Sequence, residues 1–256
     1  MGTSVAVGTT ASVAIGLVLL TLVAVVAVGA GRISSPREVV IVVVRAVVQL
    51  LVLAGVIKLI FETPLLAPVY LSVMLVVASR TSSRRLRSRG VVGTTRYAAA
   101  AIAAGAGATV IIVAGSGALP VETRQLVPFA AQVIGGAMTA TTLASVRMLD
   151  DVAGHWDEVE GWLAIGATPS QAVAGIGRRA AGAALLPALD QTRNVGLVVL
   201  PGAFVGLLLA GATPLDAGRL QVLVLVGLLC AESIAALVAT RLLGRVLGNL
   251  RPEPVT

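Results

Sequence analysis

Apolar runs long enough to cross a lipid bilayer occupy most of this sequence. One of them extends from Val5 to Ala30, and about 20 helical residues suffice to cross a hydrocarbon layer of about 30 Å. The chain is only 12% charged, whereas soluble domains have about 25% charged residues. The first run has no basic leader and exceeds the apolar region of a cleavable signal, so we expect it to be retained. The sequence therefore predicts an all-α integral membrane protein.

Seven apolar runs are spaced along the chain, and we expect each to form one transmembrane helix. They cover residues 4–29, 38–60, 65–79, 97–115, 126–147, 194–211 and 219–243. The third run is only about 22 Å long as a helix, so we expect it to lie in a thinned bilayer or to be extended by its flanks. Residues 1–256 are then predicted to form one transmembrane domain that crosses the cell's inner (plasma) membrane several times.

Basic residues between the runs predict the orientation of the chain. Lysine and arginine concentrate in the cytoplasmic loops of membrane proteins. If the N-terminus is outside, the outer side keeps only Lys58, Arg124 and Arg219, whereas the inner side receives fifteen arginines. We therefore expect the N-terminus outside and the C-terminus in the cytoplasm.

One segment between the runs is long, covering residues 148–192. In its first half Val159, Trp162 and Leu163 recur at helical spacing among acidic residues, a pattern typical of an amphipathic surface helix. With the orientation above, this segment faces the cytoplasm. We therefore expect a cytoplasmic amphipathic helix pair within the membrane domain.

A sharp elbow is predicted after the first of these helices. Gly166 suits the end of one helix and Thr168 suits the cap of the next, with a proline at the first helical position and Gln171 reaching back to the cap. Two short helices joined by a bend result. The bend can dock into a groove on a soluble ATPase. Alternatively, the pair lies on the lipid headgroups and is held there by the arginines that follow.

The elbow region resembles the EAA-type coupling loop of ABC importer permeases. That loop is written Glu-Ala-Ala, three residues, Gly, nine residues, Ile, and here Glu160, Gly166 and Ile176 have the same spacing. Gly161 and Trp162 stand where the family has two alanines. The resemblance implies that the elbow contacts a separate ATP-binding subunit.

A second resemblance extends over most of the chain. The segments that carry it are, in order, Arg45-Ala-Val-Val-Gln49-Leu50, Glu158-Val-Glu160, Leu163-Ala-Ile-Gly166-Ala167, Val195-Gly196-Leu-Val-Val-Leu-Pro201-Gly202, Leu209-Ala-Gly211 and Pro214-Leu215-Asp216-Ala217. They resemble the FetB-type iron export ABC permeases, whose relatives include plant aluminium-tolerance half-transporters. The resemblance implies a seven-helix permease that exports iron or another metal. It also implies a separate ATP-binding subunit, and our own hypothesis is that the permease acts as a homodimer.

The same resemblance assigns roles to the elbow and to the partner. ATP and Mg would be bound by the ATP-binding subunit, and no cofactor by this chain. The residues expected to dock that subunit are Glu158, Glu160, Trp162, Leu163, Gly166, Ala167, Thr168, Pro169, Arg178 and Arg179.

The sequence predicts no enzymatic site in this chain. A phosphate-binding loop of the Gly-x-x-x-x-Gly-Lys-Ser/Thr kind requires a lysine, and the single lysine, Lys58, lies outside any such pattern. His155 and Cys230 are each the single residue of their type, so we expect neither a catalytic pair nor a zinc site. Nucleic acid binding is not expected either, because no basic stripe with interleaved aromatic residues is present.

Polar side chains within the predicted spans mark a candidate transport pathway. Arg45 and Gln49 are four residues apart and share one helix face, and Glu232 in the last span is the natural counter-charge of Arg45. A charge at the membrane midplane costs about 2.5–3.5 kcal/mol, so we expect these groups to face the bundle interior. The ion pair would either fix helix packing or serve transport. The predicted pathway residues are Arg45, Gln49, Gln132, Met138, Gln221 and Glu232.

Three functions remain open at this point. The first is an ABC permease driven by its partner's ATPase. The second is a proton-coupled secondary carrier, with Glu232 as the titrating group and Arg45 as its partner. The third is a membrane scaffold that transports nothing. An ATP-binding protein encoded beside this chain would favour the first, and transport without any ATPase would favour the second.

Overall fold

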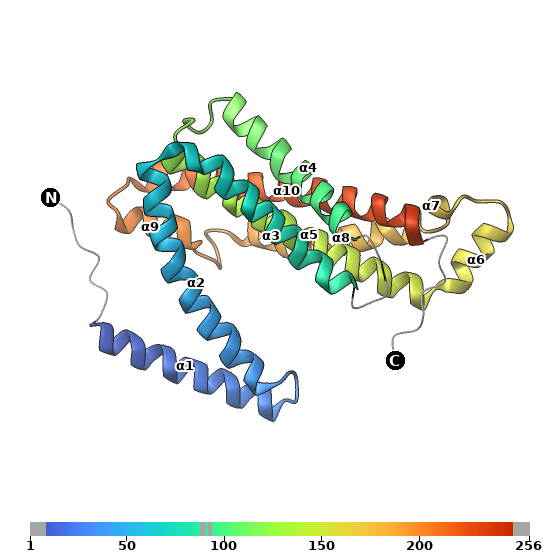
Figure 1. Cartoon of the computed structure of the whole chain (residues 1–256), viewed down its shortest axis with the longest axis horizontal. Coiled ribbons are helices and arrows are strands. Elements are labelled where there is room, and N and C mark those ends of the chain that lie inside the picture. Colours follow the sequence, from blue (N-terminus) through green and yellow to red (C-terminus); the bar gives the residue numbers. More distant parts are fainter. Residues whose placement is uncertain (1–8, 88–90, 92–93, 248–256) are drawn as a thin grey trace. The chain divides into compact units, whose positions relative to one another are not determined.

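A computed structural model of the chain describes residues 9–87, 91 and 94–247, and the described part is helical (Figure 1). No strand occurs in these ranges, apart from an isolated bridge between Val195 and Val199. The helices are α1 (Thr10–Ala30), α2 (Pro36–Glu62), the short 3-10 helix η1 (Pro64–Leu66), α3 (Ala67–Arg87), α4 (Thr94–Gly115), α5 (Thr123–Gly154), α6 (Trp156–Ala164), α7 (Pro169–Ala172), α8 (Ala174–Asn194), α9 (Gly202–Leu209) and α10 (Pro214–Leu247).

Six helical segments of the described chain are long and apolar enough to cross a membrane. They are α1, α2, η1 with α3, α4, α5 and α10. The prediction of an all-α membrane bundle is therefore confirmed. The orientation of the bundle stays a prediction from the arginine distribution.

Several predicted spans are longer in the structure. The third, expected over 65–79, continues to Arg87, because its polar end buries Ser79, Ser82 and Ser83 against neighbouring helices. The fifth and seventh, expected over 126–147 and 219–243, extend to Thr123–Gly154 and Pro214–Leu247. The first was expected from residue 4, and its residues 4–8 lie outside the described residues.

The predicted sixth span, 194–211, is not one continuous helix. The chain leaves helical geometry after Asn194, where Gly196 has a φ of +79°. Pro201 disfavours helical geometry in the residue before it, and α9 begins only at Gly202. The expectation of a continuous helix over this range is therefore wrong.

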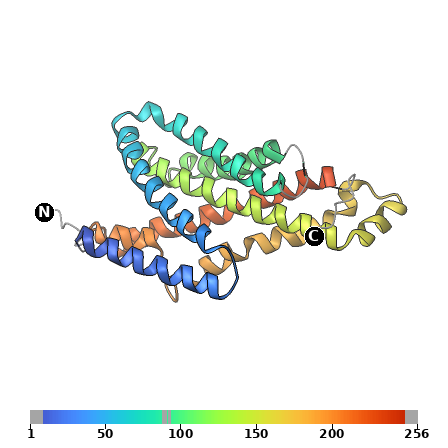
Figure 2. The ribbon, with the colours of Figure 1, turned by 60° about the horizontal axis from the view of Figure 1, so that its bottom comes forward.

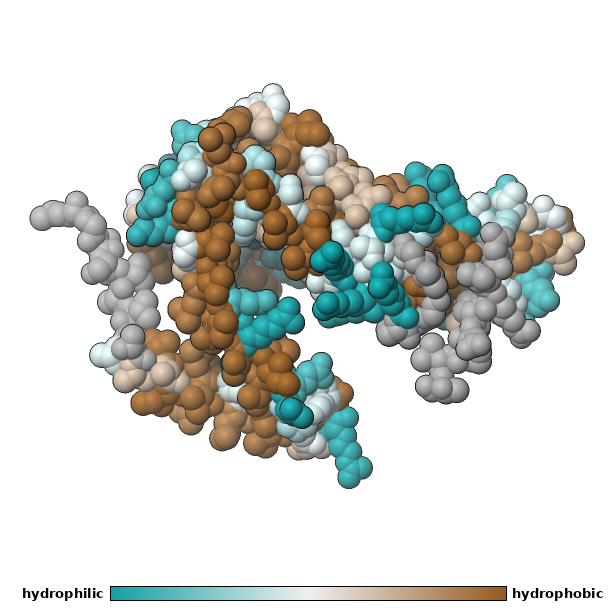
Figure 3. Space-filling view, viewed as in Figure 1, coloured by the Kyte–Doolittle hydropathy of each residue, from teal (hydrophilic) through white to brown (hydrophobic). Residues whose placement is uncertain are grey.

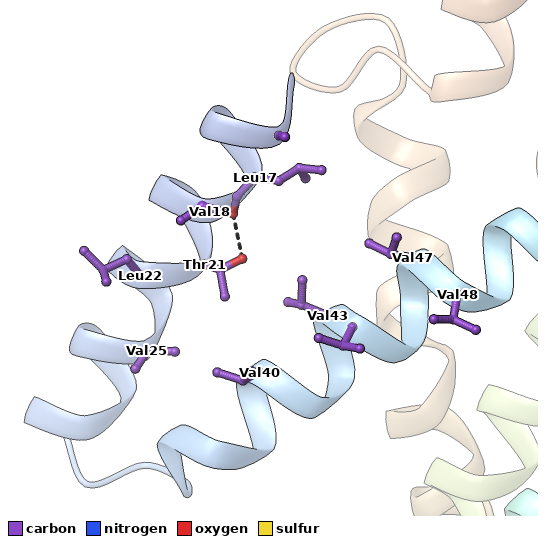
Figure 4. A pocket seen from close by; sticks show the side chains of 11 residues that line it. Leu17, Val18, Thr21, Leu22, Val25, Val40, Val43, Val47 and Val48 are labelled. Atoms are coloured by element: carbon purple, nitrogen blue, oxygen red, sulfur yellow. Dashed lines mark hydrogen bonds between the residues drawn. The ribbon is translucent and has the colours of Figure 1, made fainter. Parts of the chain in front are cut away.

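By its contacts the chain divides into two units, and the first consists of residues 1–64 with 209–211. Its helices α1 and α2 contact each other and expose many apolar side chains, which cover much of the face seen in Figure 3. The crevice between them has a volume of about 540 Å³ and is lined mainly by valine and leucine (Figure 4). Thr21 is the polar side chain in this lining, and its hydroxyl donates to the Leu17 carbonyl at 2.7 Å. The lining of the crevice is therefore almost wholly apolar.

The second unit, residues 65–208 and 212–256, is a bundle in which α3, α4, α5 and α10 lie side by side (Figures 1 and 2). Small residues bring the helices together. A Cβ atom at Gly105 of α4 would overlap the Ala231 carbonyl oxygen of α10. Such close backbone approach is typical of membrane helix packing, where small residues form the contacts.

Helix α8 belongs to this bundle, packing along both α5 and α10. It buries Ile176, Gly177, Ala180, Ala184 and Ala188 on one face. Near its start, a Cβ on Gly177 would lie 3.4 Å from Met148 Cε and 3.5 Å from Thr240 Cβ. The second helix of the predicted pair, α7, is short, and the 21-residue α8 follows it after Val173.

Candidate functional site

The predicted elbow lies at one end of the second unit, where α6 and α7 meet (Figure 1, right). Helix α5 continues to Gly154, and His155 separates it from α6. Helix α6 is nine residues long and α7 only four. The elbow itself is the short linker of residues 165–168 between them.

Two nested backbone hydrogen bonds end α6 in a Schellman motif. The amide of Ala167 donates to the Trp162 carbonyl at 3.0 Å, and the amide of Gly166 donates to the Leu163 carbonyl at 3.0 Å. This motif requires a left-handed residue, and Gly166 has a φ of +91°. The prediction that Gly166 ends the first helix is confirmed.

A capping box starts α7. The backbone N–H of Gln171 donates to Thr168 Oγ1 at 3.4 Å, while the backbone N–H of Thr168 donates to Gln171 Oε1 at 2.8 Å. Pro169 occupies the first helical turn, where its missing amide hydrogen is tolerated. Because both sides of the elbow are capped by local bonds, its geometry is set by the linker's own residues.

An apolar cluster holds the elbow against the ends of α5 and α10. Val159 of α6 and Val173, just before α8, are fully buried among Met148, Val152 and Leu243. Leu163, which we expected to dock a partner, packs partly against this cluster. It therefore helps to anchor the elbow, and its role in docking stays a prediction.

The outer surface of the elbow combines apolar and charged side chains around a groove. Trp162 is 50% exposed and Ile165 76% exposed. They line a groove of about 540 Å³ together with Glu158 and Arg178. Exposed aromatic and aliphatic residues beside charges are typical of protein interfaces.

The two predicted acidic docking residues differ in their contacts. Glu158 Oε2 lies 4.0 Å from Nη2 of Arg179, and this ion pair links α6 to α8. Glu160 is exposed on α6, and the structure gives it no ion pair within the described residues. Glu160 is therefore the more available of the two for a basic partner.

An arginine crevice adjoins the groove, and sequence reasoning missed it. Arg178 of α8 and Arg241 and Arg245 of α10 line a space of about 370 Å³. No described acidic residue forms an ion pair with any of them. The i, i+4 spacing of Arg241 and Arg245 was a usable signal, since it puts both on one face of the last helix.

Glu232 of α10 lies against Gly136 of α5. A Cβ on Gly136 would lie 2.7 Å from Glu232 Oε1 and 2.7 Å from Leu228 Cδ2. The carboxylate is half-buried, and no described residue of the second unit forms a hydrogen bond or an ion pair with it. It is thus a carboxylate within a membrane helix without a polar partner in its own unit.

The other predicted pathway residues of the second unit lie on α5 and α10. Gln221 is buried and its Oε1 accepts no hydrogen bond in the described structure, but it lies eleven residues earlier on α10. Gln132 is exposed on α5, and Met138 packs partly against the main apolar cluster. Their role in a pathway stays a prediction.

Arg45 and Gln49 belong to the first unit, where both are exposed on α2. Glu232 belongs to the second unit. The predicted pairing of Arg45 with Glu232 therefore stays a prediction. Among residues 9–87, 91 and 94–247, no three His, Cys, Asp or Glu side chains form a group that holds a metal ion.

Comparisons with known proteins show which family the chain resembles. The model of the uncharacterised protein family UPF0014 matches residues 10–247 of the chain. The match therefore runs from α1 to the end of α10 and includes the elbow.

Three named relatives are similar over most of the chain. "UPF0014 membrane protein STAR2" of Oryza sativa subsp. japonica is 34% identical over 82% of this chain and 74% of its own. "Probable iron export permease protein FetB" of Escherichia coli (strain K12) is 30% identical over 96% of this chain and 95% of its own. "Protein ALUMINUM SENSITIVE 3" of Arabidopsis thaliana is 31% identical over 88% of this chain and 82% of its own. No solved structure matches the chain.

Proposed function

Because the chain belongs to the UPF0014 family of membrane proteins, we propose that it is the membrane-spanning subunit of an ABC-type transporter. It is a multi-pass protein of permease type, and its bacterial relatives point to the inner membrane. A separate ATP-binding subunit docks on the elbow, and two copies of the chain form the permease. ATP and Mg are bound by that subunit, and this chain binds no cofactor.

The observation that carries this proposal is the elbow itself. It is capped on both sides, anchored on the ends of two membrane helices, and exposes Trp162 and Ile165. A partner that binds these side chains would move the ends of α5 and α10, on which the elbow is packed. The chain has no lysine in a phosphate-binding loop, so an ATP-driven step needs another subunit.

The proposed cargo is a metal cation, moved out of the cytoplasm. One relative is named for iron export and another for aluminium sensitivity. Both names concern metal cations, which supports that class of cargo for this chain without selecting one metal.

A secondary carrier is the second candidate, and Glu232 favours it. A half-buried carboxylate within a membrane helix, without a polar partner in its own unit, is typical of groups that bind or release protons or cations. In that case transport would follow a proton gradient and would persist without an ATPase.

One pair of matched variants tests the docking site. Ile165→Asp places a charge on the elbow, and Val121→Asp places one on an equally exposed residue, 73% against 76%, in the linker between α4 and α5. Both would be co-expressed with the candidate ATP-binding subunit, and the recovered complex would be measured by affinity purification. We expect the amount of recovered complex to fall at least about tenfold for Ile165→Asp, as for an interface hot spot. Val121→Asp should leave this amount unchanged.

The outcome that contradicts docking at the elbow is equal recovery from both variants. Metal uptake into vesicles in the absence of the ATP-binding subunit, abolished by Glu232→Gln, would establish the carrier instead.

A further inference from the structure

The depth of α8 in the membrane follows from the helices it contacts. Helix α5 has no charged residue from 125 to 146, and α10 has only Glu232 from 220 to 240. Each stretch is about 32 Å long at 1.5 Å per residue, the thickness of the hydrocarbon layer. These stretches therefore mark the part of the bundle that lies within lipid.

Helix α8 enters this layer near its first turn. Gly177 contacts Met148 and Thr240, which lie at one edge of the two uncharged stretches. Two turns later Ala184 clusters with Ala140, Ala144 and Ala236, which lie inside them. Because α8 moves steadily inward, its last residues reach the middle of the layer.

Asp190 is six residues beyond Ala184, or about 9 Å further along the axis. Its side chain is 60% exposed, and that of Arg193 is 74% exposed. Asp190 Oδ1 and Arg193 Nη1 are 3.6 Å apart, longer than a strong charge-assisted hydrogen bond. A charge that faces lipid at this depth is strongly unfavourable, so this face of α8 must meet water or protein.

The backbone after α8 supports the same conclusion. The amides of Leu197, Val198 and Val199 all donate to the Asn194 carbonyl, and Gly196 donates to Val199. Among the described residues, the carbonyls of Gly196, Leu197 and Val198 accept no backbone hydrogen bond. Irregular backbone at membrane depth is tolerated only where it is buried in protein or lines a water-filled cavity.

We propose that the exposed face of α8 and the break at residues 195–201 line a water-filled cation path, in which Asp190 attracts the cation. The carboxyl end of a helix carries partial negative charge, and here it points at the break with its free carbonyls. All three groups favour a cation over an anion. Arg193 is the loosely held counter-ion that the cation displaces.

This path revises the prediction that all of residues 148–192 lie in the cytoplasm, since α8 instead extends along α5 and α10 toward the middle of the lipid layer. Its role as a transport path rests on the proposed function. Its access to water rests on the geometry of α8 alone, so the two are tested separately.

Cysteine labelling in native membranes tests the access to water. In a Cys230→Ala background, Leu189→Cys places a thiol beside Asp190, and Val226→Cys places one at a similar depth on an exposed, apolar part of α10. A membrane-impermeant cationic methanethiosulfonate should label Leu189→Cys at least about ten times faster than Val226→Cys. Equally slow labelling of both, with full labelling after denaturation, would overturn the path and leave docking at the elbow untouched.

The preference for cations has its own readout. With Leu189→Cys, the cationic reagent should react faster than its anionic counterpart, because the Asp190 carboxylate raises the local concentration of cations. Adding Asp190→Asn should lower this ratio by about three- to tenfold, and Asp190→Glu should preserve it. A ratio of labelling rates that Asp190→Asn leaves unchanged, or one that favours the anionic reagent, would refute the role of Asp190.

Discussion

The contact between α4 and α10 gives a sharp prediction, because two glycines of α4 differ only in what they face. A Cβ at Gly105 would overlap the Ala231 carbonyl oxygen and lie 3.0 Å from Ala235 Cβ, whereas a Cβ at Gly107 would have no neighbour within 4 Å. The first obstacle is backbone, which cannot rotate away. Gly105→Ala must therefore push the two helices apart, and Gly107→Ala need not.

The expected difference follows from the two free-energy terms involved. Overpacking costs about 1–3 kcal/mol, while replacing glycine by alanine within a helix gains up to about 1 kcal/mol. Because both variants share the gain, the free energies of unfolding should differ by about 1–3 kcal/mol. At about 2–4 °C per kcal/mol for a chain of this size, the melting temperature of Gly105→Ala should lie about 2–12 °C below that of Gly107→Ala.

Thermal unfolding in detergent, followed by the loss of the monodisperse peak in size-exclusion chromatography, measures this difference. Gly107→Ala serves as the control for helix propensity and for expression. Equal melting temperatures would show that α4 and α10 do not approach at Gly105, and the arrangement of the second unit would then be wrong.

Four further substitutions have definite expected results. Thr168→Ala removes the capping box and should cost about 1 kcal/mol, seen as a lower melting temperature. Ile176→Ala empties a fully buried site and should cost about 2–5 kcal/mol, with faster proteolysis near the elbow. Arg179→Gln breaks an exposed ion pair, so the free energy of unfolding should change by less than about 1 kcal/mol. Gly136→Ala displaces the far ends of two flexible side chains, those of Glu232 and Leu228, so transport should fall while the melting temperature changes little.

The elbow could be predicted from the sequence because its geometry is local. Gly166 and Thr168 satisfy their helix ends with bonds to residues at most five positions away. Turn chemistry of this kind needs no knowledge of distant segments. The partial burial of Leu163 could not be predicted in this way, since it depends on contacts with residues of the apolar cluster far along the chain.

The course of α8 could not be predicted in the same way. Asp190 and Arg193 give residues 174–194 the composition of a solvated loop, so a hydropathy argument assigns them to the cytoplasm. Their depth becomes visible only once Ala184 is seen among the alanines of α5 and α10. The arginine crevice was missed for a related reason, because Arg178 and Arg245 come together only through helix packing.

Helices α5 and α10 are 32 and 34 residues long, about 50 Å each, and the one proline within them, Pro128 of α5, lies near the end of α5 that is distant from the elbow. Each therefore behaves as a stiff rod that is longer than the layer it crosses. A sideways push of a few ångströms on the protruding end tilts the whole rod, so the carboxylate of Glu232 is displaced without any loop having to refold. Force applied at one membrane surface thus becomes movement at its centre through leverage.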